Sequence, residues 1–331
     1  MNIAINGFGR IGRCTFKAAF GKKNIKIVGI NDLTDTKTLA HLLKHDTAYS
    51  DFEGKVDFDE KNLIVGGKKI PVFAEKNPSV LPWGKLNVDV VLECTGRFTD
   101  KVGAERHLKA GAKKVIISAP AKGTDVPTYV RSVNCGKVGG EKSKIINNAS
   151  CTTNCIAPVM AILEETFGID KAMMTTVHAY TADQNLQDGP HKDLRRARAA
   201  AANMVPTTTG AAKAIGEVIP AVKGNFDGIS IRVPIITVSM SDITVVLKKD
   251  VTKEEINKTF TEAAKKSRFE GVLTVTNEPL VSSDFIGNTY SATVDLSLTY
   301  VVGGNLVKVI AWYDNEYGYA NRLVEIAELF A

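Results

Sequence analysis

The chain has 331 residues, of which 44% are apolar and 24% are charged, and this ordinary globular composition excludes a disordered or fibrous protein. Its net charge of +6 is mild for this length. Because the basic residues are dense only in residues 191–198, the charge alone does not indicate a nucleic-acid or membrane-surface protein.

The first half of the chain alternates short apolar runs with helical patterns. Helices are expected at residues 10–20, 36–44 and 101–110. Four runs rich in Val and Ile are predicted to be buried parallel strands: residues 3–6, 25–31, 88–94 and 114–118. The alternation predicts an α/β protein whose N-terminal domain, residues 1–150, is a Rossmann-type doubly wound parallel sheet.

The pattern changes near Ser150, where a helix over residues 150–167 is expected. Two-residue alternation, as at Val294, Leu296 and Leu298, favours an α+β catalytic domain with a mixed or antiparallel sheet over residues 151–314. Its strands are expected at residues 172–178, 229–232, 237–248, 272–276, 293–300 and 306–313.

Two further helices are expected in this half. Thr252 and Glu255 form a capping-box pattern ahead of an apolar stripe, which predicts a helix start. Residues 315–331 carry apolar residues at helical spacing and are expected to pack back on the first domain.

Gly7, Gly9 and Gly12 form a Gly-x-Gly-x-x-Gly motif between a predicted strand and a predicted helix. These glycines allow a tight turn, a close approach to a pyrophosphate and close helix packing, while the helix N-terminus offers N–H groups to the anion. Asp32 follows the next strand, twenty residues past Gly12, where a carboxylate meets ribose hydroxyls. The sequence therefore predicts a dinucleotide site.

Cys151 is the predicted nucleophile. It lies in the polar run Asn-Asn-Ala-Ser-Cys-Thr-Thr-Asn-Cys of residues 147–155, at a strand-to-helix junction, where a helix N-terminus is expected to lower the pKa of a thiol. Cys155 lies one turn further on and is expected to be a buried apolar residue. The five cysteines form no Cys-x-x-Cys pair, which argues against a zinc ribbon or a disulfide scaffold and favours a reducing compartment.

The residues alone leave the catalytic base open among five histidines. His178 is a candidate because it follows an apolar strand and precedes a polar segment. His41 and His45 are spaced as metal ligands on a helix, but no third ligand accompanies them, so no metal site is expected.

Hydroxyls and arginines suited to phosphate recur in the second half, although two of the arginines could instead be solvated or bridge subunits. They are Thr181, Arg195, Arg196, Thr207, Thr208, Thr209, Gly210 and Arg232.

Residues 6–13, 149–155, 207–214 and 312–319 together resemble the glyceraldehyde-3-phosphate dehydrogenase family, and the resemblance runs from end to end. It implies a cytoplasmic, glycolytic homotetramer whose S-shaped loop, including residues 183–198, lies between subunits. It implies that the chain oxidises D-glyceraldehyde 3-phosphate with NAD and inorganic phosphate to 1,3-bisphosphoglycerate, through a cysteine hemithioacetal and a thioester.

The resemblance also assigns roles to residues. Cys151 becomes the nucleophile and His178 its base. The NAD would be bound by Gly7, Gly9, Arg10, Ile11, Gly12, Asp32, Ser118 and Asn315. The substrate side would use Thr181, Arg196 and Arg232, and the attacking phosphate would use Ser150, Thr152, Thr209 and Gly210.

Departures from the family pattern stand at residues 235–236, which read Ile-Ile, and at Lys76 and Asn77 near the expected adenine. A related enzyme acting on erythrose 4-phosphate is an alternative of the same fold. A basic nucleic-acid or surface-binding module is an alternative of another class, but it would require clustered basic and aromatic residues, and aromatic residues are scattered and make up only 7%.

Overall fold

The computed structural model describes residues 1–331, except for the side chain of Lys137. The chain divides into two units. Unit 1 contains Met1–Tyr129, Cys135–Ala149 and Ala320–Ala331, and unit 2 contains Val130–Asn134 and Ser150–Tyr319. Among the described residues, no helix combines the length and apolarity needed to cross a membrane.

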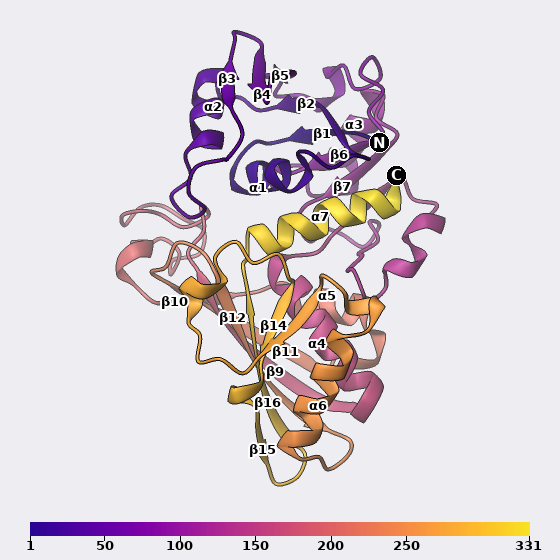
Figure 1. Ribbon diagram of the computed structural model, residues 1–331, viewed down its shortest axis with the longest axis vertical. Helices are drawn as coiled ribbons and strands as arrows, with labels where there is room; N and C mark the ends of the chain where they lie inside the picture. Colours follow the sequence, from indigo (N-terminus) through magenta and orange to yellow (C-terminus); the bar gives the residue numbers. More distant parts are fainter. The chain divides into compact units, whose positions relative to one another are not determined.

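Unit 1 is built on one sheet with the strand order β3-β4-β5-β2-β1-β6-β7-β8 (Figure 1). Its strands are β1 Asn2–Asn6, β2 Lys26–Asn31, β3 Val56–Phe58, β4 Asn62–Val65, β5 Lys68–Phe73, β6 Val90–Glu93, β7 Lys114–Ile117 and β8 Ile145–Asn147. All pairs from β5 to β8 are parallel, whereas β3 and β4 pair antiparallel at one edge. The predicted parallel sheet is confirmed, and the strands β3, β4 and β5 on one side of β2 were not predicted.

Both faces of this sheet are covered, which defines the doubly wound arrangement. Neighbouring residues of β1 point to opposite faces: Ala4 packs into a cluster with Ala104 of α3, and Ile5 packs into another with Phe16 of α1 and Leu39 of α2. The helices are α1 Arg10–Ala19, α2 Thr36–Lys44 and α3 Lys101–Lys109.

The last helix, α7 Tyr317–Phe330, contributes its residues from Ala320 onward to unit 1. Asn24 donates to Glu328 at 2.8 Å, and the Lys114 ammonium contacts both the carbonyl and the ring of Phe330. These contacts attach the end of the chain to the N-terminal sheet.

Unit 2 is built on a mixed sheet with the order β10-β11-β9-β12-β16-β14-β13, and β15 pairs with β16. Its strands are β9 Ile169–Ala179, β10 Val205–Thr208, β11 Phe226–Val233, β12 Ser239–Leu247, β13 Leu273–Thr276, β14 Ala292–Asp295, β15 Tyr300–Val302 and β16 Leu306–Tyr313. The central strand β9 runs parallel to β11 and antiparallel to β12. The predicted α+β domain with a mixed sheet is therefore confirmed.

Three helices lie together on one face of this sheet (Figure 1): α4 Cys151–Phe167, α5 Ala211–Val218 and α6 Lys253–Ala264. The predicted capping box at Thr252 and Glu255 begins α6, since each side chain accepts the other's backbone N–H. Short 3-10 helices join the elements of both units: η1 Pro78–Val80, η2 Cys135–Gly140, η3 Ala200–Ala202, η4 Pro220–Val222, η5 Ser267–Phe269, η6 Ser282–Phe285 and η7 Leu296–Leu298.

The expectation of one strand over residues 293–300 is wrong. β14 ends at Asp295, whose Oδ1 accepts the Ser297 N–H at 3.1 Å and the Ser297 hydroxyl at 2.6 Å. This local capping turns Leu296 and Leu298 into a 3-10 helix, so their two-residue spacing does not reflect a strand.

Candidate active site

Cys151 is the first residue of α4, and the chain turns sharply to place it there. Ala149 has a left-handed backbone (φ 52°), a conformation that costs an L-residue about 1–2 kcal/mol. Ser150 then caps the helix by accepting the Thr153 N–H at 3.0 Å. The Cys151 thiol is therefore held at a helix N-terminus.

His178 approaches this thiol from the penultimate position of β9. Its Nε2 lies 3.5 Å from Cys151 Sγ, and its Nδ1 lies 2.7 Å from the Ala179 carbonyl oxygen. Arg232 is the register partner of His178 on β11, and its guanidinium contacts the same Nδ1 and lies 3.3 Å from the same carbonyl. The sheet therefore brings together three residues that lie far apart in the sequence.

Burial keeps both groups of the Cys151–His178 pair uncharged at rest. Burial raises the pKa of the Cys151 thiol, and the Arg232 charge and hydrogen bonds from Thr152 oppose this only in part. Burial, followed by the Arg232 charge, lowers the pKa of His178 to about 3. The expectation of a lowered thiol pKa is wrong for the resting protein, because desolvation outweighs the helix terminus.

A buried tyrosine, Tyr313, packs against His178 and contacts the neighbours of the pair. The Tyr313 hydroxyl lies 2.9 Å from the Thr152 hydroxyl and 2.8 Å from the Thr176 hydroxyl, and its ring meets His178 edge to face at 6.0 Å. Burial raises the pKa of Tyr313, so the phenol stays neutral. Cys155 is fully buried as expected, its Sγ lies 3.9 Å from the Ala311 carbonyl oxygen, and burial raises its pKa as well.

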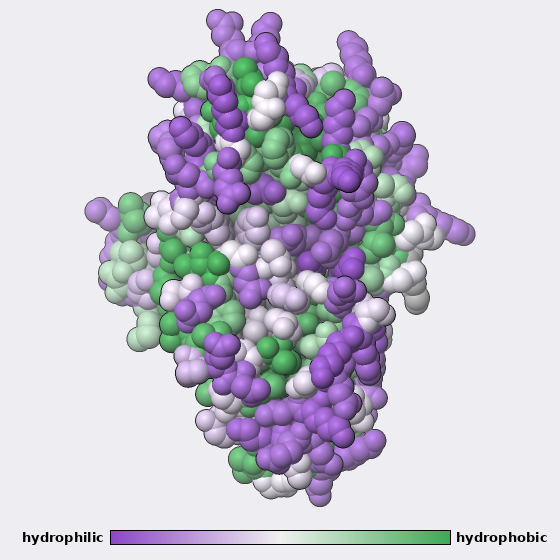
Figure 2. Space-filling model, in the orientation of Figure 1, coloured by the Kyte–Doolittle hydropathy of each residue, from purple (hydrophilic) through white to green (hydrophobic). Residues whose placement is uncertain are grey.

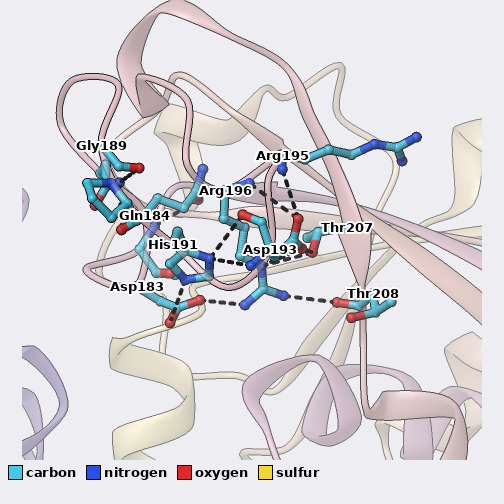
Figure 3. Close-up of polar contacts among 12 residues, drawn as sticks. Asp183, Gln184, Gly189, His191, Asp193, Arg195, Arg196, Thr207 and Thr208 are labelled. Carbon is cyan, nitrogen blue, oxygen red and sulfur yellow. Dashed lines mark hydrogen bonds and ion pairs between the residues drawn. The ribbon is translucent and has the colours of Figure 1, made fainter.

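Arg196 lies in a polar cluster on the segment before β10 (Figure 3). Its guanidinium forms an ion pair with Asp183, and its Nε donates to the Thr207 hydroxyl at 2.8 Å, which in turn donates to Asp193 at 2.8 Å. The Arg195 guanidinium points away from the cluster. Of these two arginines, Arg196 is therefore the one held in place by the loop's own carboxylates.

The remaining candidates for phosphate contact are placed by local turns. Thr181 donates its N–H to Gln184 at 3.3 Å, directly after β9. The Thr209 hydroxyl accepts the Ala211 N–H at 3.2 Å, and Gly210 is the N-cap of α5. A helix N-terminus follows each of the two hydroxyl-rich segments, at Ser150 and at Gly210.

Unit 1 has a cavity of about 510 Å³ at the carboxyl ends of β1 and β2, a size typical of ligand sites. Gly7, Gly9 and Asp32 line it. A Cβ on Gly7, which has φ 92°, would lie 2.8 Å from the Thr95 nitrogen, and one on Gly12 would lie 2.1 Å from the Gly7 carbonyl oxygen. These glycines are required by close backbone packing, as a dinucleotide loop needs.

Asp32 already has partners in this cavity. Its carboxylate accepts the Phe8 N–H at 2.7 Å and the Thr34 N–H at 3.0 Å, so it tethers the glycine-rich loop to the end of β2. Lys76 also lines the cavity, whereas Asn77 instead begins η1 by accepting the Ser79 N–H.

The other residues expected at the cofactor do not line this cavity. Arg10 and Ile11 begin α1, and Arg10 forms an ion pair with Asp46 at 3.0 Å. Ser118 follows β7 and is not among the residues that line the cavity. Asn315 belongs to unit 2, where its Oδ1 accepts the Ser239 hydroxyl at 2.8 Å.

The histidine pair on α2 does not form part of a metal site. The His41 and His45 rings lie 5.0 Å apart, and His45 contacts Asp51 at 2.8 Å. Within the part of the chain that the structure describes, no group of three or more metal-ligating side chains is found.

Comparison with known proteins decides the family. Residues 1–101 match the glyceraldehyde 3-phosphate dehydrogenase NAD binding domain, and residues 150–315 match the C-terminal domain of the same enzyme. The chain belongs to the glyceraldehyde-3-phosphate dehydrogenase family. It is 56% identical over 329 residues to the glyceraldehyde-3-phosphate dehydrogenase of Thermotoga maritima, covering 99% of this chain and 98% of that relative. It is 51% identical over 331 residues to that of Geobacillus stearothermophilus, covering 100% and 98%.

For this member of the glyceraldehyde-3-phosphate dehydrogenase family, sequence reasoning identified the nucleotide loop and the cysteine motif but missed their supports. Tyr313, Ser239 and Asp183 were not singled out for a role, and Glu93 and His107 were not recognised as partners. Tyr313, Ser239 and Glu93 are polar residues within or beside an apolar run, which is the signal that could have indicated them. Asp183 and His107 stand among polar or charged residues and carry no such signal.

We predict that replacing His178 in this dehydrogenase with asparagine lowers turnover by about 10² to 10⁴-fold, the usual contribution of a general base. The same change should move the pH profile of Cys151 alkylation to higher pH, because the thiol loses the group that takes its proton. The rate of iodoacetamide labelling against pH measures this, in a Cys155→Ser background and followed on the peptide that carries Cys151, because Cys14, Cys94 and Cys135 remain in the chain. An unchanged profile would remove His178 from this role.

Proposed function

We propose that this chain is a glycolytic, phosphorylating glyceraldehyde-3-phosphate dehydrogenase. It oxidises D-glyceraldehyde 3-phosphate with NAD and inorganic phosphate to 1,3-bisphosphoglycerate. The single observation that carries the proposal is the thiol at a helix N-terminus 3.5 Å from an imidazole that itself contacts an arginine. The family match and the printed names of the relatives favour the triose phosphate over erythrose 4-phosphate and over a nucleic-acid or surface-binding role.

The first step forms a covalent bond to Cys151. Its sulfur adds to the aldehyde carbon as the thiol proton moves to His178 Nε2, and the imidazolium then returns this proton to the carbonyl oxygen. The product is a hemithioacetal. The backbone N–H of Cys151, at the start of α4, is the proposed donor to the oxygen while it is charged.

The second step removes two electrons. NAD, when bound, supplies the hydride acceptor. His178 Nε2 takes the hemithioacetal hydroxyl proton as the carbon loses its hydride, which leaves a thioester on Cys151. Inorganic phosphate then attacks the thioester carbon and breaks the C–S bond. The sulfur leaves as a thiolate and takes back the proton that His178 Nε2 holds from the oxidation, and the acyl phosphate departs.

Base catalysis at Nε2 requires the imidazole proton to be on Nδ1, where it is donated to the Ala179 carbonyl. Arg232 can only donate, so its contact with Nδ1 favours the opposite tautomer. We propose that the substrate phosphate draws the Arg232 guanidinium to itself and thereby leaves Nδ1 to Ala179. Substrate binding and activation of the base would then be linked through one side chain.

The remaining site assignments are part of this proposal. Thr181 and Arg196 would join Arg232 on the substrate side, and the attacking phosphate would be held between the two hydroxyl-rich helix N-termini. The residues that would hold the attacking phosphate are Ser150, Thr152, Thr209 and Gly210. Those proposed for NAD are Gly7, Gly9, Arg10, Ile11, Gly12, Asp32, Ser118 and Asn315. Residues 1–150, 151–314 and 315–331 would be the nucleotide-binding domain, the catalytic domain and the terminal helix.

We further propose a cytoplasmic homotetramer. Large apolar side chains are exposed on the segment between β9 and β10, among them Leu186 and Leu194 at 81% and Met204 at 75%. Hydrophobic side chains gather on the left of the face drawn in Figure 2. An apolar surface of this kind favours contact with another subunit.

The function predicts a stoichiometric burst. With aldehyde and NAD but no phosphate, the protein should form about one reduced nicotinamide per active site and then stall, because the thioester has no acceptor. Adding phosphate should restore turnover, which absorbance of the reduced nicotinamide follows. Cys151→Ser should form none, while Cys155→Ser, the matched control, should retain most activity. Sustained turnover without phosphate would indicate a hydrolytic enzyme, and a higher kcat/KM for erythrose 4-phosphate would favour the tetrose substrate.

Arg232→Ala should raise the Michaelis constant for glyceraldehyde 3-phosphate at least tenfold, because a charge-assisted hydrogen bond contributes about 1.5–3 kcal/mol. The Michaelis constant for unphosphorylated glyceraldehyde should rise much less. Arg195→Ala is the control, since its guanidinium points away from the cluster. Steady-state kinetics with both aldehydes measure the difference, and equal losses for the two would show that Arg232 supports structure only.

We expect NAD to be preferred over NADP by about 10² or more in kcat/KM. A 2′-phosphate about 4 Å from the Asp32 carboxylate would be repelled by about 4 kcal/mol at an effective dielectric constant near 20, before solvent and rearrangement reduce it. Asp32→Ala should reduce this preference by raising kcat/KM for NADP. It should also weaken NAD binding, because the hydrogen bond from the Phe8 N–H to the Asp32 carboxylate is lost. Use of both cofactors within threefold by the unmodified protein would contradict this role.

A further inference from the structure

A buried carboxylate and a buried histidine lie in unit 1, and the proposed chemistry uses neither. Glu93 is the last residue of β6 and His107 lies on α3, and both side chains are 0% exposed. His107 Nε2 lies 3.0 Å from Glu93 Oε2. Burying two ionisable groups has a large desolvation cost, which hydrogen-bond partners must offset. The partners of Glu93 and His107 therefore indicate the role of this pair.

The tautomer of His107 is fixed by Trp83. The indole Nε1–H can only donate, and it points at His107 Nδ1 at 3.0 Å, so Nδ1 must accept. The ring proton therefore lies on Nε2 and is donated to Glu93. A histidine held in this way has no nitrogen left to take a proton, which indicates orientation of the carboxylate and not acid–base catalysis.

The Glu93 carboxylate accepts hydrogen bonds from three residues. Besides His107, its Oε2 accepts the Asn6 amide at 2.5 Å, and its Oε1 accepts both the Thr95 N–H at 2.8 Å and the Thr95 hydroxyl. Four donors on one carboxylate satisfy its negative charge in the absence of water. The carboxylate therefore fixes the positions of Asn6 and Thr95.

These two residues lead directly to the cavity at the carboxyl ends of the strands. Asn6 Oδ1 accepts the Asn31 amide at 2.7 Å, and Asn31 in turn accepts the Glu75 N–H at 2.9 Å and donates to the Glu75 carbonyl at 3.0 Å. Four residues of this network line the cavity together with Gly7 and Asp32: Asn6, Asn31, Glu75 and Thr95. Asn6 is the register partner of both Asn31 and Glu93, so the network crosses the strand ends where the sheet order reverses.

We propose that Glu93, oriented by His107 and Trp83, is a positioning residue for dinucleotide binding. Its carboxylate holds one wall of the cavity in the shape that accepts the cofactor. This inference rests on the proposed function, since it takes the cavity to be the NAD site. It adds residues that lie behind the wall and do not contact the cofactor.

Glu93→Gln tests the inference. A carboxamide keeps the shape but replaces one acceptor oxygen with a donor, so two of the four donors to Glu93 lose their acceptor. We expect the dissociation constant for NAD, measured calorimetrically on the folded variant, to rise about tenfold or more, which corresponds to about 1.4 kcal/mol. The Michaelis constant for NAD should rise in parallel, while that for the aldehyde at saturating NAD stays within about twofold.

Trp83→Phe is the second variant and keeps the protein testable if Glu93→Gln fails to fold. It retains an aromatic ring beside Phe73 but removes the donor that fixes the His107 tautomer. The NAD dissociation constant should rise about threefold or more. Tyr129→Phe is the matched control, because it removes a hydroxyl-to-carboxylate contact with Glu141 in the same unit and neither residue lines the cavity. It should lower the unfolding temperature without changing the NAD dissociation constant.

A purely structural role would lower the unfolding temperature of the Glu93 and Trp83 variants while leaving NAD affinity unchanged, and that result would overturn the inference. Asp32→Ala, measured in the same way, distinguishes a failure of the positioning role from a failure of the assignment of the cavity as the NAD site. If it weakens NAD binding while the Glu93 and Trp83 variants do not, only the positioning role is wrong. If none of the three affects NAD binding, the assignment of the cavity as the NAD site fails as well.

Discussion

A thiol and an imidazole that burial keeps uncharged lie 3.5 Å apart, and the proposed chemistry depends on passing one proton between them. Charging either group alone in this site is unfavourable, but moving a proton from Sγ to Nε2 creates two opposite charges in contact. The cost of desolvation is then offset by attraction within the pair, while the nearby Arg232 charge favours the thiolate and disfavours the imidazolium. Each surrounding element, from the N-terminus of α4 to the end of β9, serves to fix this distance.

In both units, the polar side chains of the proposed site stand at or near the ends of parallel strands. Parallel strands bring their carboxyl ends to one edge of a sheet, and the residue that ends a strand is where a polar side chain can be both rigid and accessible. In unit 1, Asn6, Asn31 and Glu93 end β1, β2 and β6 in register. In unit 2, His178 and Arg232 are paired near the ends of β9 and β11.

Local patterns in the sequence predicted what depends on local physics. The glycine spacing, the strand before it and Asp32 identified the nucleotide loop, and the hydroxyl-rich motif around Cys151 identified the helix start. The direction of the thiol pKa could not be obtained in this way, because it depends on how much protein from other elements surrounds Sγ.

Nonlocal partners were beyond such reasoning. His107 stands among Glu105, Arg106 and Lys109 in the sequence, which gives no sign of burial, yet its ring is fully buried against Glu93, fourteen positions away. The strands β3 and β4 have only three and four residues, which is too short to establish a period. Leu296 and Leu298 did show a period of two, but a side-chain cap from Asp295 redirected the chain.

The carboxylates around Arg196 change how an anion would bind there. Because Asp183 already neutralises the guanidinium, an arriving phosphate must replace an internal partner of the same sign. Binding becomes an exchange in which one ion pair is broken as another forms, so the number of paired charges stays nearly constant. Dissolved salt would then screen the lost and the gained attraction alike. The proposed phosphate site at Arg196 would therefore discriminate between anions by geometry and hydrogen bonding more than by charge.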